Sequence, residues 1–398
     1  MNYLYRISFI TFFAGMVLFA YRNQWIIIRS PWIRMQTAAV SVQEAHKKKV
    51  KIWRYQQGLP IFEQQHMLWD EKNIAINASR LVNAYLSLLY EENMLDKKIE
   101  VQAVTVNPTG TELGINFSHN IFQEEQSIHT KWMLIEGLLQ TIREQIPAIK
   151  SVNLLVNHHP LPDHHLDFSH AWPIEGFLTV AEPHLSTAVH KKETRTLTIM
   201  LEPAGDAHYT GRIIEDAFER GISLQCAQEL KKVLESTCKN SRIILSRFPG
   251  ETLEPLQNAA FANRLKTDVY ITLSMYPLPL SRAKNDPLTE INLYYFLYHP
   301  ATDFWQRATA TLSCEPYHQA HIPHSRTSQL LAHTLFKNLQ NTKPLAGKLT
   351  HCGGLPVKPL IGVAAPALII ELGLAHKNAW QALVVQLAQQ ICDLLPLI

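Results

Sequence analysis

The stretch from Leu197 to Glu235 places the tightest limits on what this chain can fold into. It opens with a short apolar segment that ends at Pro203, and a polar loop follows. The rest of the stretch sets apolar residues three and four positions apart, at Leu224, Ala227, Leu230 and Leu234. This spacing predicts a helix with one buried face. A strand, a polar loop and a helix in this order form the first unit of an α/β domain.

Composition limits the class of protein. The chain has 398 residues, of which 46% are hydrophobic, and this is enough for two domains with separate cores. The formal net charge of +3 is small for such a length, so nucleic-acid binding is not expected. The five cysteines are odd in number, widely spaced and without a C-x-x-C pair, which indicates neither a disulfide framework nor a zinc knuckle. Four of them could still pair in an oxidising compartment.

The N-terminal segment predicts attachment to a membrane. Residues 7–21 form an uncharged apolar run, and residues 25–28 add a second apolar patch. The run is shorter than the roughly 20 residues of a comfortable span, but it suits the apolar part of a signal sequence. Because no clear cleavage site follows, we expect residues 1–34 to form an uncleaved signal anchor, with a cleaved signal peptide or a buried helix as alternatives. Residues 35–48 then form a basic linker.

Several motifs in the second half of the chain resemble those of the zinc-dependent N-acetylmuramoyl-L-alanine amidases, which cut peptidoglycan between the sugar and its stem peptide. Glu202-Pro203 and residues 219–227 are similar to the family's D-P-G-H-G-G and E-K-D-x-N-L-x-x-A patterns. Four later segments follow in the family's order, at residues 241–247, 258–263, 267–276 and 367–378. The resemblance covers residues 195–398 and implies a mixed sheet flanked by helices on both faces.

The same resemblance implies a site that has lost part of its metal ligands. The family holds zinc with two histidines and a glutamate, and a second glutamate acts in catalysis. Glu219 falls on the glutamate ligand and Glu371 on the catalytic glutamate, whereas the two histidine positions are Gly205 and Ser274. Two carboxylates alone are a poor zinc site, because zinc prefers nitrogen and sulfur donors. We therefore expect no cofactor, unless His208 substitutes as a ligand and the enzyme is active with zinc.

Residues 49–173 resemble the GerMN domain, a small α/β module of bacterial envelope proteins. The likeness rests on residues 81–89, 105–118, 141–157 and 167–169. Alternating and helical patterns predict strands at residues 99–106, 112–117 and 152–157, and a helix at residues 127–144. Residues 174–194 contain Pro183 and a charged cluster, and we interpret them as a linker that lets the two domains move independently.

Two histidine groups invite a metal-site interpretation. His158, His159, His164 and His165 surround a proline-containing turn, and His318, His321 and His324 recur at intervals of three. Both groups lie in segments with proline, where a regular helix is not expected to bring the rings together. We therefore expect solvated loops at both places.

Together these patterns predict an α/β protein with an N-terminal membrane anchor, a small GerMN-like domain and an amidase-like domain. The predicted function is that of a membrane-anchored cell-envelope protein, a pseudoenzyme that binds or regulates at peptidoglycan or its stem peptide. The alternatives are a divergent active amidase and a non-enzymatic scaffold that contacts other envelope or wall-synthesis proteins. The basic residues after position 21 would by themselves keep the bulk of the chain in the cytoplasm. Both resemblances instead imply a single-pass protein, held by residues 7–28, with its domains on the outer side.

Overall fold

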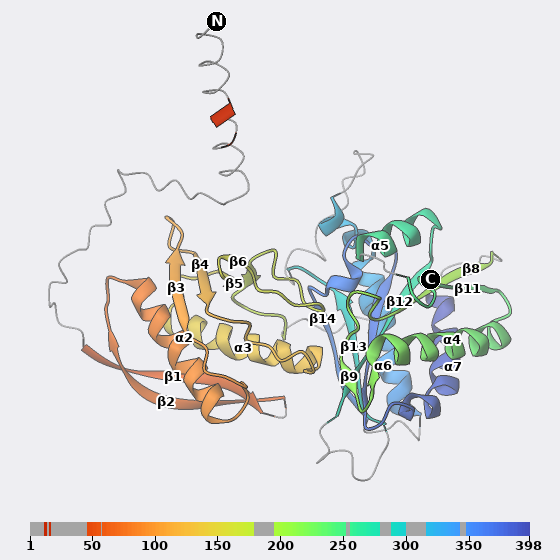
Figure 1. The fold of residues 1–398 in the computed structure, drawn as a ribbon, viewed down its shortest axis with the longest axis horizontal. Coiled ribbons are helices and arrows are strands. Elements are labelled where there is room, and N and C mark those ends of the chain that lie inside the picture. Colours follow the sequence, from red (N-terminus) through yellow and green to blue (C-terminus); the bar gives the residue numbers. More distant parts are fainter. Residues whose placement is uncertain are drawn as a thin grey trace, which may run out of the picture. The chain divides into compact units, whose positions relative to one another are not determined.

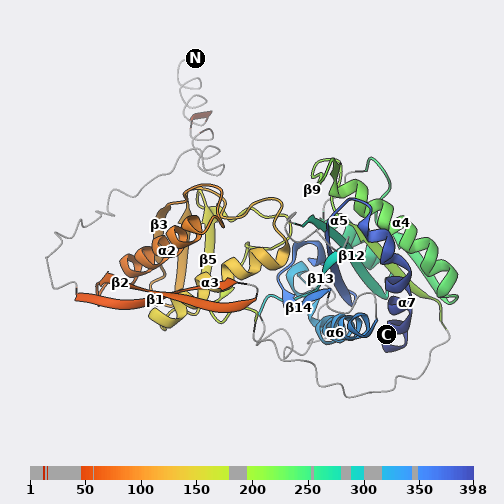
Figure 2. The same cartoon turned by 90° about the horizontal axis from the view of Figure 1, so that it is seen from below.

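The computed structural model describes residues 46–56, 58–178, 195–251, 255–278, 288–299, 316–342 and 348–398, together with Phe12, Phe13 and Met16 (Figures 1 and 2). Residues 47–398 form one compact unit, separate from residues 1–46. Apart from those three residues, the predicted anchor lies outside the described part, as do residues 179–194 of the predicted linker. Within the described part, no helix is both long enough and apolar enough to cross a membrane.

A five-stranded sheet organises the first half of the compact unit. Its strands are β3 (Val101–Val106), β4 (Glu112–Phe117), β5 (Ser151–Val156), β6 (His159–Pro160) and β7 (Trp172–Pro173). β4 pairs antiparallel with β3 and parallel with β5, and both short strands pair antiparallel with β5. The three strands predicted for this half are thus confirmed to within two residues.

Two helices and a hairpin complete this half. The helices are α2 (Ile74–Glu91) and α3 (Ile128–Gln145), and the hairpin consists of β1 (His46–Gln56) and β2 (Leu59–Trp69). α3 begins where predicted, because the Ser127 hydroxyl accepts a hydrogen bond from the Thr130 N–H at 3.0 Å. β1 packs against the same helix, where the Trp53 N–H donates to the Thr141 hydroxyl at 2.8 Å.

The second half is built on a six-stranded mixed sheet with the order β11-β8-β12-β15-β13-β14. Its strands are β8 (Leu197–Pro203), β11 (Ser241–Leu245), β12 (Val269–Pro277), β13 (Leu288–Phe296), β14 (Leu349–Leu355) and β15 (Ala367–Leu374). β11, β8, β12 and β15 run parallel, whereas β13 is antiparallel to β15 and parallel to β14. A short hairpin, β9 (Ile213–Ile214) and β10 (Ala217–Phe218), precedes the first helix.

Successive residues of a strand point to opposite faces of the sheet, and helices cover the apolar residues on both faces. On one face, Ile199, Ile271 and Ile370 share an apolar cluster with residues of three helices, α4 (Glu219–Thr237), α6 (Ser325–Asn341) and α7 (Val384–Leu394). On the other face, Met200 and Tyr270 pack with α5 (Pro255–Arg264). The predicted mixed sheet with helices on both faces is therefore present. Five short 3-10 helices, at residues 317–319, 322–324, 358–360, 379–382 and 395–397, complete the elements of the described part.

The two halves share one hydrophobic core, which corrects the expectation that they move independently. A single cluster joins buried residues of α2 and α3 to Met200, Tyr294 and Ile369 of the second sheet. The described start of the predicted linker is also packed, since Ile174 and Phe177 are each only 2% exposed. The domain limits at residues 49–173 and 195–398 remain predictions, but an apolar interface of this kind favours a fixed arrangement.

A disulfide joins Cys238, at the end of α4, to Cys392 in α7. The sequence left such pairing open without favouring it, because a separation of 154 residues gives no local spacing signal. Cys226 is buried and Cys352 is partly buried, and neither belongs to this disulfide. Disulfides persist mainly in oxidising compartments, so this bond indicates a location outside the cytoplasm.

Candidate functional site

Three of the sequence-predicted site residues meet at one place in the second sheet. Ser274 in β12 and Glu371 in β15 are direct partners across the parallel pair, and Glu219 is the first residue of α4. β12 and β15 are buried on both faces, as central parallel strands are, so a polar side chain there needs a polar partner. Both glutamate side chains are 0% exposed.

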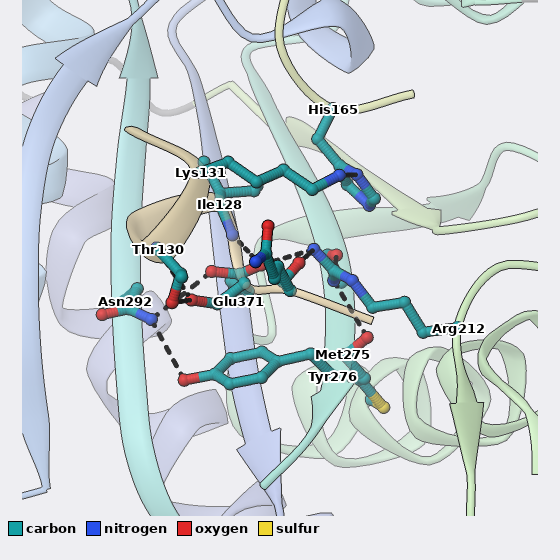
Figure 3. Close-up of polar contacts among 12 residues, drawn as sticks. Ile128, Thr130, Lys131, His165, Arg212, Met275, Tyr276, Asn292 and Glu371 are labelled. Atoms are coloured by element: carbon teal, nitrogen blue, oxygen red, sulfur yellow. Dashed lines mark hydrogen bonds and ion pairs between the residues drawn. The ribbon is translucent and has the colours of Figure 1, made fainter. Parts of the chain in front are cut away.

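Arg212 supplies that partner (Figure 3). One terminal nitrogen, Nη2, lies 2.9 Å from Glu371 Oε1, and Nη1 lies 3.7 Å from Glu219 Oε1. Nη1 also donates to the Ser274 hydroxyl at 3.2 Å and to the Met275 carbonyl at 3.0 Å. The guanidinium thus lies between the two carboxylates that the family resemblance assigns to zinc binding and catalysis.

Each carboxylate receives further hydrogen bonds from its surroundings. Glu219 Oε1 accepts from the Ser274 hydroxyl at 2.9 Å and from the Met275 N–H at 2.7 Å. Glu219 Oε2 accepts from the Arg212 N–H at 3.1 Å. The chain can pass this close to Glu219 because Gly211 has φ +74°, and a Cβ there would lie 2.7 Å from Glu219 Oε2.

The first half of the compact unit closes the site from the other side. The Ile128 N–H, in the first turn of α3, donates to Glu371 Oε1 at 2.9 Å, and Arg212 Nη2 donates to the Gln126 carbonyl at 3.0 Å. Figure 3 shows Ile128 pointing at Glu371. A helix N-terminus carries free N–H groups and partial positive charge, which suits a carboxylate. Tyr294 and Asn292 donate to Glu371 Oε2 at 3.2 and 3.4 Å.

The electrostatics of the site depend on this pairing. Burial raises the pKa of Glu371 above its ordinary value, and the charge of Arg212 and the Ile128 N–H oppose that rise. Burial alone would lower the pKa of Arg212, but the carboxylates of Glu219 and Glu371 outweigh it and raise that pKa. Arg212 therefore stays charged, and it is the cation that keeps two acidic groups in a dry interior.

These residues do not fit the zinc that the family resemblance implies. Zinc sites in enzymes use three protein donors, with imidazole or thiolate prominent among them. Here the carboxylates are paired with a guanidinium, and a hydroxyl stands at the Ser274 position. Among the described residues, no group of three or more His, Cys, Asp or Glu side chains is placed to hold a metal ion. No chemical step through zinc can be built on this arrangement.

The other two predicted positions lie outside the cluster. Gly205 has φ +76°, and the atoms nearest to a Cβ there would belong to Arg220 and Tyr209, at 2.9 to 3.1 Å. A histidine at this position would therefore be strained and crowded. His208 is exposed, and its backbone N–H donates to Asp206 Oδ1 at 2.7 Å in a local turn. The proposed substitution of His208 as a ligand is thus not supported by its position.

A second buried polar cluster lies beside the first. Lys131 in α3 forms an ion pair with Asp163, and Asp163 Oδ1 accepts from the backbone N–H of His165 at 2.9 Å. Figure 3 places Lys131 and His165 next to each other, near Glu371. His165 is 4% exposed and His321, in the other histidine group, is 6% exposed, so the expectation of solvated loops is wrong at both residues. The loop of His165 is fixed by a hydrogen bond in which the Lys358 N–H donates to the His165 carbonyl at 2.8 Å.

Reasoning from the sequence missed Arg212. The residue lies in the polar loop before α4 and belongs to no family motif. A signal was nevertheless available, because two retained glutamates without their histidines need another source of positive charge. Arg212 lies seven residues before Glu219. Charge balance, rather than motif spacing, would have pointed to it.

No family model and no curated protein sequence matches the chain. Solved structures do show a likeness over half of it. The catalytic domain of the N-acetylmuramoyl-L-alanine amidase CwlV from Bacillus (Paenibacillus) polymyxa is 15% identical, with 50% of this chain and 96% of that domain covered and a TM-score of 0.35. An N-acetylmuramoyl-L-alanine amidase from Clostridium difficile 630 is 19% identical, with coverages of 50% and 95% and a TM-score of 0.36. A putative lipoprotein from Clostridium perfringens is 20% identical, with coverages of 32% and 87% and a TM-score of 0.20.

Proposed function

We propose that this chain is a cell-envelope protein that acts at peptidoglycan without hydrolysing it, and that its amidase-like half is a pseudoenzyme. The observation that carries the proposal is the Arg212 guanidinium between Glu219 and Glu371. A zinc enzyme needs a metal that lowers the pKa of a bound water, and a general base with a free lone pair. A guanidinium does not activate water in this way, and Glu371 accepts hydrogen bonds from four groups.

The buried site also changes where wall binding is expected. The sequence suggested that the retained glutamates could contact a stem peptide, but both side chains are fully buried and already paired. We therefore assign peptidoglycan contact to the protein surface outside this cluster. The disulfide supports a location outside the cytoplasm, and the GerMN-like identity of residues 49–173 and anchoring through residues 7–28 are parts of the proposal.

The second candidate is a scaffold that contacts envelope or wall-synthesis proteins and never the wall. It is favoured by the position of α3, whose first turn donates to the fully buried Glu371. In this interpretation the former catalytic glutamate holds the two halves together. Both candidates predict no catalysis, and they differ in whether the protein binds peptidoglycan.

The decisive experiment uses the full-length chain purified in detergent. Elemental analysis should find far less than one zinc per chain, and incubation with peptidoglycan should release no peptide, with or without added zinc, while an active zinc amidase assayed in parallel does. Sedimentation with insoluble peptidoglycan then separates the wall-binding candidate from the scaffold. Stoichiometric zinc together with hydrolysis that Glu371→Gln abolishes would instead establish the active amidase.

A further inference from the structure

The edge of the second sheet carries a groove that the proposed function does not use. Among the described strands, β11 pairs only with β8, so its other side is not paired with a described strand. That side lines a groove of about 680 Å³ together with Lys231 of α4 and with Phe261 and Arg264 of α5. Figure 1 shows β11 with α4 and α5 nearby. An open strand edge presents a row of N–H and C=O groups that can pair with an added strand.

Two hydrogen bonds show which backbone groups face the groove. The Ser246 N–H donates to the Leu201 carbonyl of β8 at 2.9 Å, so Ser246 is directed into the sheet. Lys231 Nζ donates to the Ile243 carbonyl at 3.0 Å from the opposite side. Because backbone groups alternate in direction along a strand, those of Ile243 and Leu245 are directed toward the groove.

Two buried polar side chains in the groove have an atom without a partner. Ser246 is 5% exposed and Asn258 is 6% exposed, and both line the groove. Asn258 Nδ2 donates to Glu202 Oε1 at 2.7 Å, whereas Asn258 Oδ1 and the Ser246 hydroxyl oxygen have no hydrogen-bond partner within the described part of the chain. An amide oxygen can only accept, so it calls for a ligand with an N–H or O–H group.

The rim of the groove is cationic and partly apolar. It carries Lys231, Arg242 and Arg264 against a single acid, Glu251, whose Oε2 already accepts from the Phe248 N–H at 2.7 Å. Arg242 and Arg264 are exposed, and neither forms an ion pair with a described side chain, whereas Lys231 pairs with Glu235 at 3.4 Å. Phe248, also in the rim, is 63% exposed. This combination suits an acidic ligand that also buries apolar groups.

We propose that this groove binds an extended, acidic segment of a partner protein, which adds as a strand beside β11. The segment's main chain pairs with the open edge, one of its N–H groups donates to Asn258 Oδ1, and its carboxylates pair with Arg242 and Arg264. Main-chain pairing supplies affinity in such strand addition, and the side chains supply specificity. The inference is independent of the Arg212 cluster, so its failure would leave the proposed function untouched.

The test measures binding of a fluorescent peptide of about eight residues, which is strand length, that alternates glutamate and valine. We expect the full-length protein to bind it, with affinity that falls as salt rises. Arg242→Glu combined with Arg264→Glu should weaken binding about tenfold or more, since two attractive pairs become repulsive. The matched control reverses two exposed lysines in the other half, Lys72→Glu and Lys98→Glu, and should bind like the unmodified protein.

Three results would overturn the inference. The first is the absence of binding, or equal binding of a peptide in which lysine replaces glutamate. The second is unchanged affinity of two peptides, each N-methylated at one of the two alternating sets of amides, because strand addition requires the N–H groups of one set. The third is displacement of the peptide by soluble peptidoglycan fragments, which would make the groove a wall-binding site. Circular dichroism of both double variants confirms that the exposed substitutions leave the fold intact.

Discussion

Arg212 holds this site together through charge and hydrogen bonds, which is chemistry unlike that of a metal ion. Zinc accepts lone pairs and so needs imidazole or carboxylate ligands, whereas a guanidinium donates hydrogen bonds and needs acceptors. Ser274 suits a guanidinium partner, because its hydroxyl accepts a hydrogen bond from Arg212 and donates one to Glu219. Ser274 and Arg212 are thus chemically matched.

The stability of the site should depend on its charge balance. Arg212→Met leaves two buried carboxylates without a cation, and breaking a buried ion pair in this way costs about 3–5 kcal/mol. Adding Glu371→Gln removes one negative charge together with the positive one, so the double variant should recover much of the loss. The free energy of unfolding in urea checks both. Arg242→Met, at an exposed residue, serves as the control and should change it by less than about 0.5 kcal/mol. Equal losses in the single and double variants would show that shape, and not charge, matters at Arg212.

The predictability of individual residues follows from where they lie. Glu219 and Glu371 could be identified because they sit inside motifs on regular elements, α4 and β15. Arg212 could not, because it lies in a loop whose path is set by Gly211 and by the turn at Asp206. Gly205 stays a predicted match to a histidine position of the family. Its left-handed backbone, which now argues against restoring a histidine there, has no sequence signal beyond the glycine itself.

At the scale of elements, the contact between α3 and β14 should make stability depend on pH. His351 in β14 stacks on His129 in α3 with ring centroids 5.0 Å apart, and burial, helped by His129, lowers the pKa of His351 to about 3. Between about pH 3 and pH 6.5, the His351 ring is neutral in the folded protein but protonated in the unfolded chain. The contribution of this group to the free energy of unfolding is therefore fully present above pH 6.5. Below pH 6.5 it falls by about 1.4 kcal/mol per pH unit.

The variant His351→Phe removes that group and should reduce the slope of unfolding free energy against pH by about this amount. Urea unfolding at pH values from about 7 down to 5 gives the slope directly. His66→Gln, an exposed residue of β2, should leave it unchanged. A slope that is the same in His351→Phe and in the unmodified protein would exclude His351 as its source.

The disulfide links two elements that already pack together, α4 and α7. In the chain-entropy estimate, closing a loop with a sequence separation of 154 residues stabilises the folded state by about 5 kcal/mol. Cys238→Ser combined with Cys392→Ser should therefore lower the melting temperature, and a reducing agent should do the same to the unmodified protein. Cys352→Ser changes a cysteine outside this disulfide and provides the control. If the double serine variant melts like the unmodified protein, the cysteines do not form this bond in solution.

The elements themselves were largely predictable, and their exceptions are instructive. α3 and β4 were expected within two residues of their observed ends, because strong periodicity and a serine cap mark them. β2 was not predicted, since most of its residues are exposed on both faces and give no alternation. The disulfide partner of Cys238 could not be predicted from the sequence either, because only the packing of α4 on α7 brings Cys392 near it.

At the scale of the whole molecule, the sequence predicted two independently moving domains, whereas the structure joins the two halves through one hydrophobic core. The two resemblances describe halves that fold around different sheets, and a long proline-containing segment between them indicates a linker. The sequence pattern cannot show that residues of the first half, including Trp132, cover part of one face of the second sheet. Trp132 packs edge to face against His351 with centroids 4.5 Å apart. An interface formed by residues far apart in the sequence has no local periodicity.

The two halves should therefore stay together when the chain between them is cut. A protease site placed within residues 179–194 of the full-length protein tests this without a denaturant. After complete cleavage, the fragments should co-elute in gel filtration, because the shared apolar cluster and the hydrogen bonds from Ile128 and Lys358 persist without the connection. Trp132→Ala, which removes a 1% exposed side chain at a cost of about 3–5 kcal/mol, should make the cleaved fragments separate on dilution. Leu178→Ala, at a partly exposed side chain outside that contact, should not. Fragments of the unmodified sequence that elute apart directly after cleavage would show that the halves are independent domains, and that the pairing of Ile128 with Glu371 does not hold the second half in place.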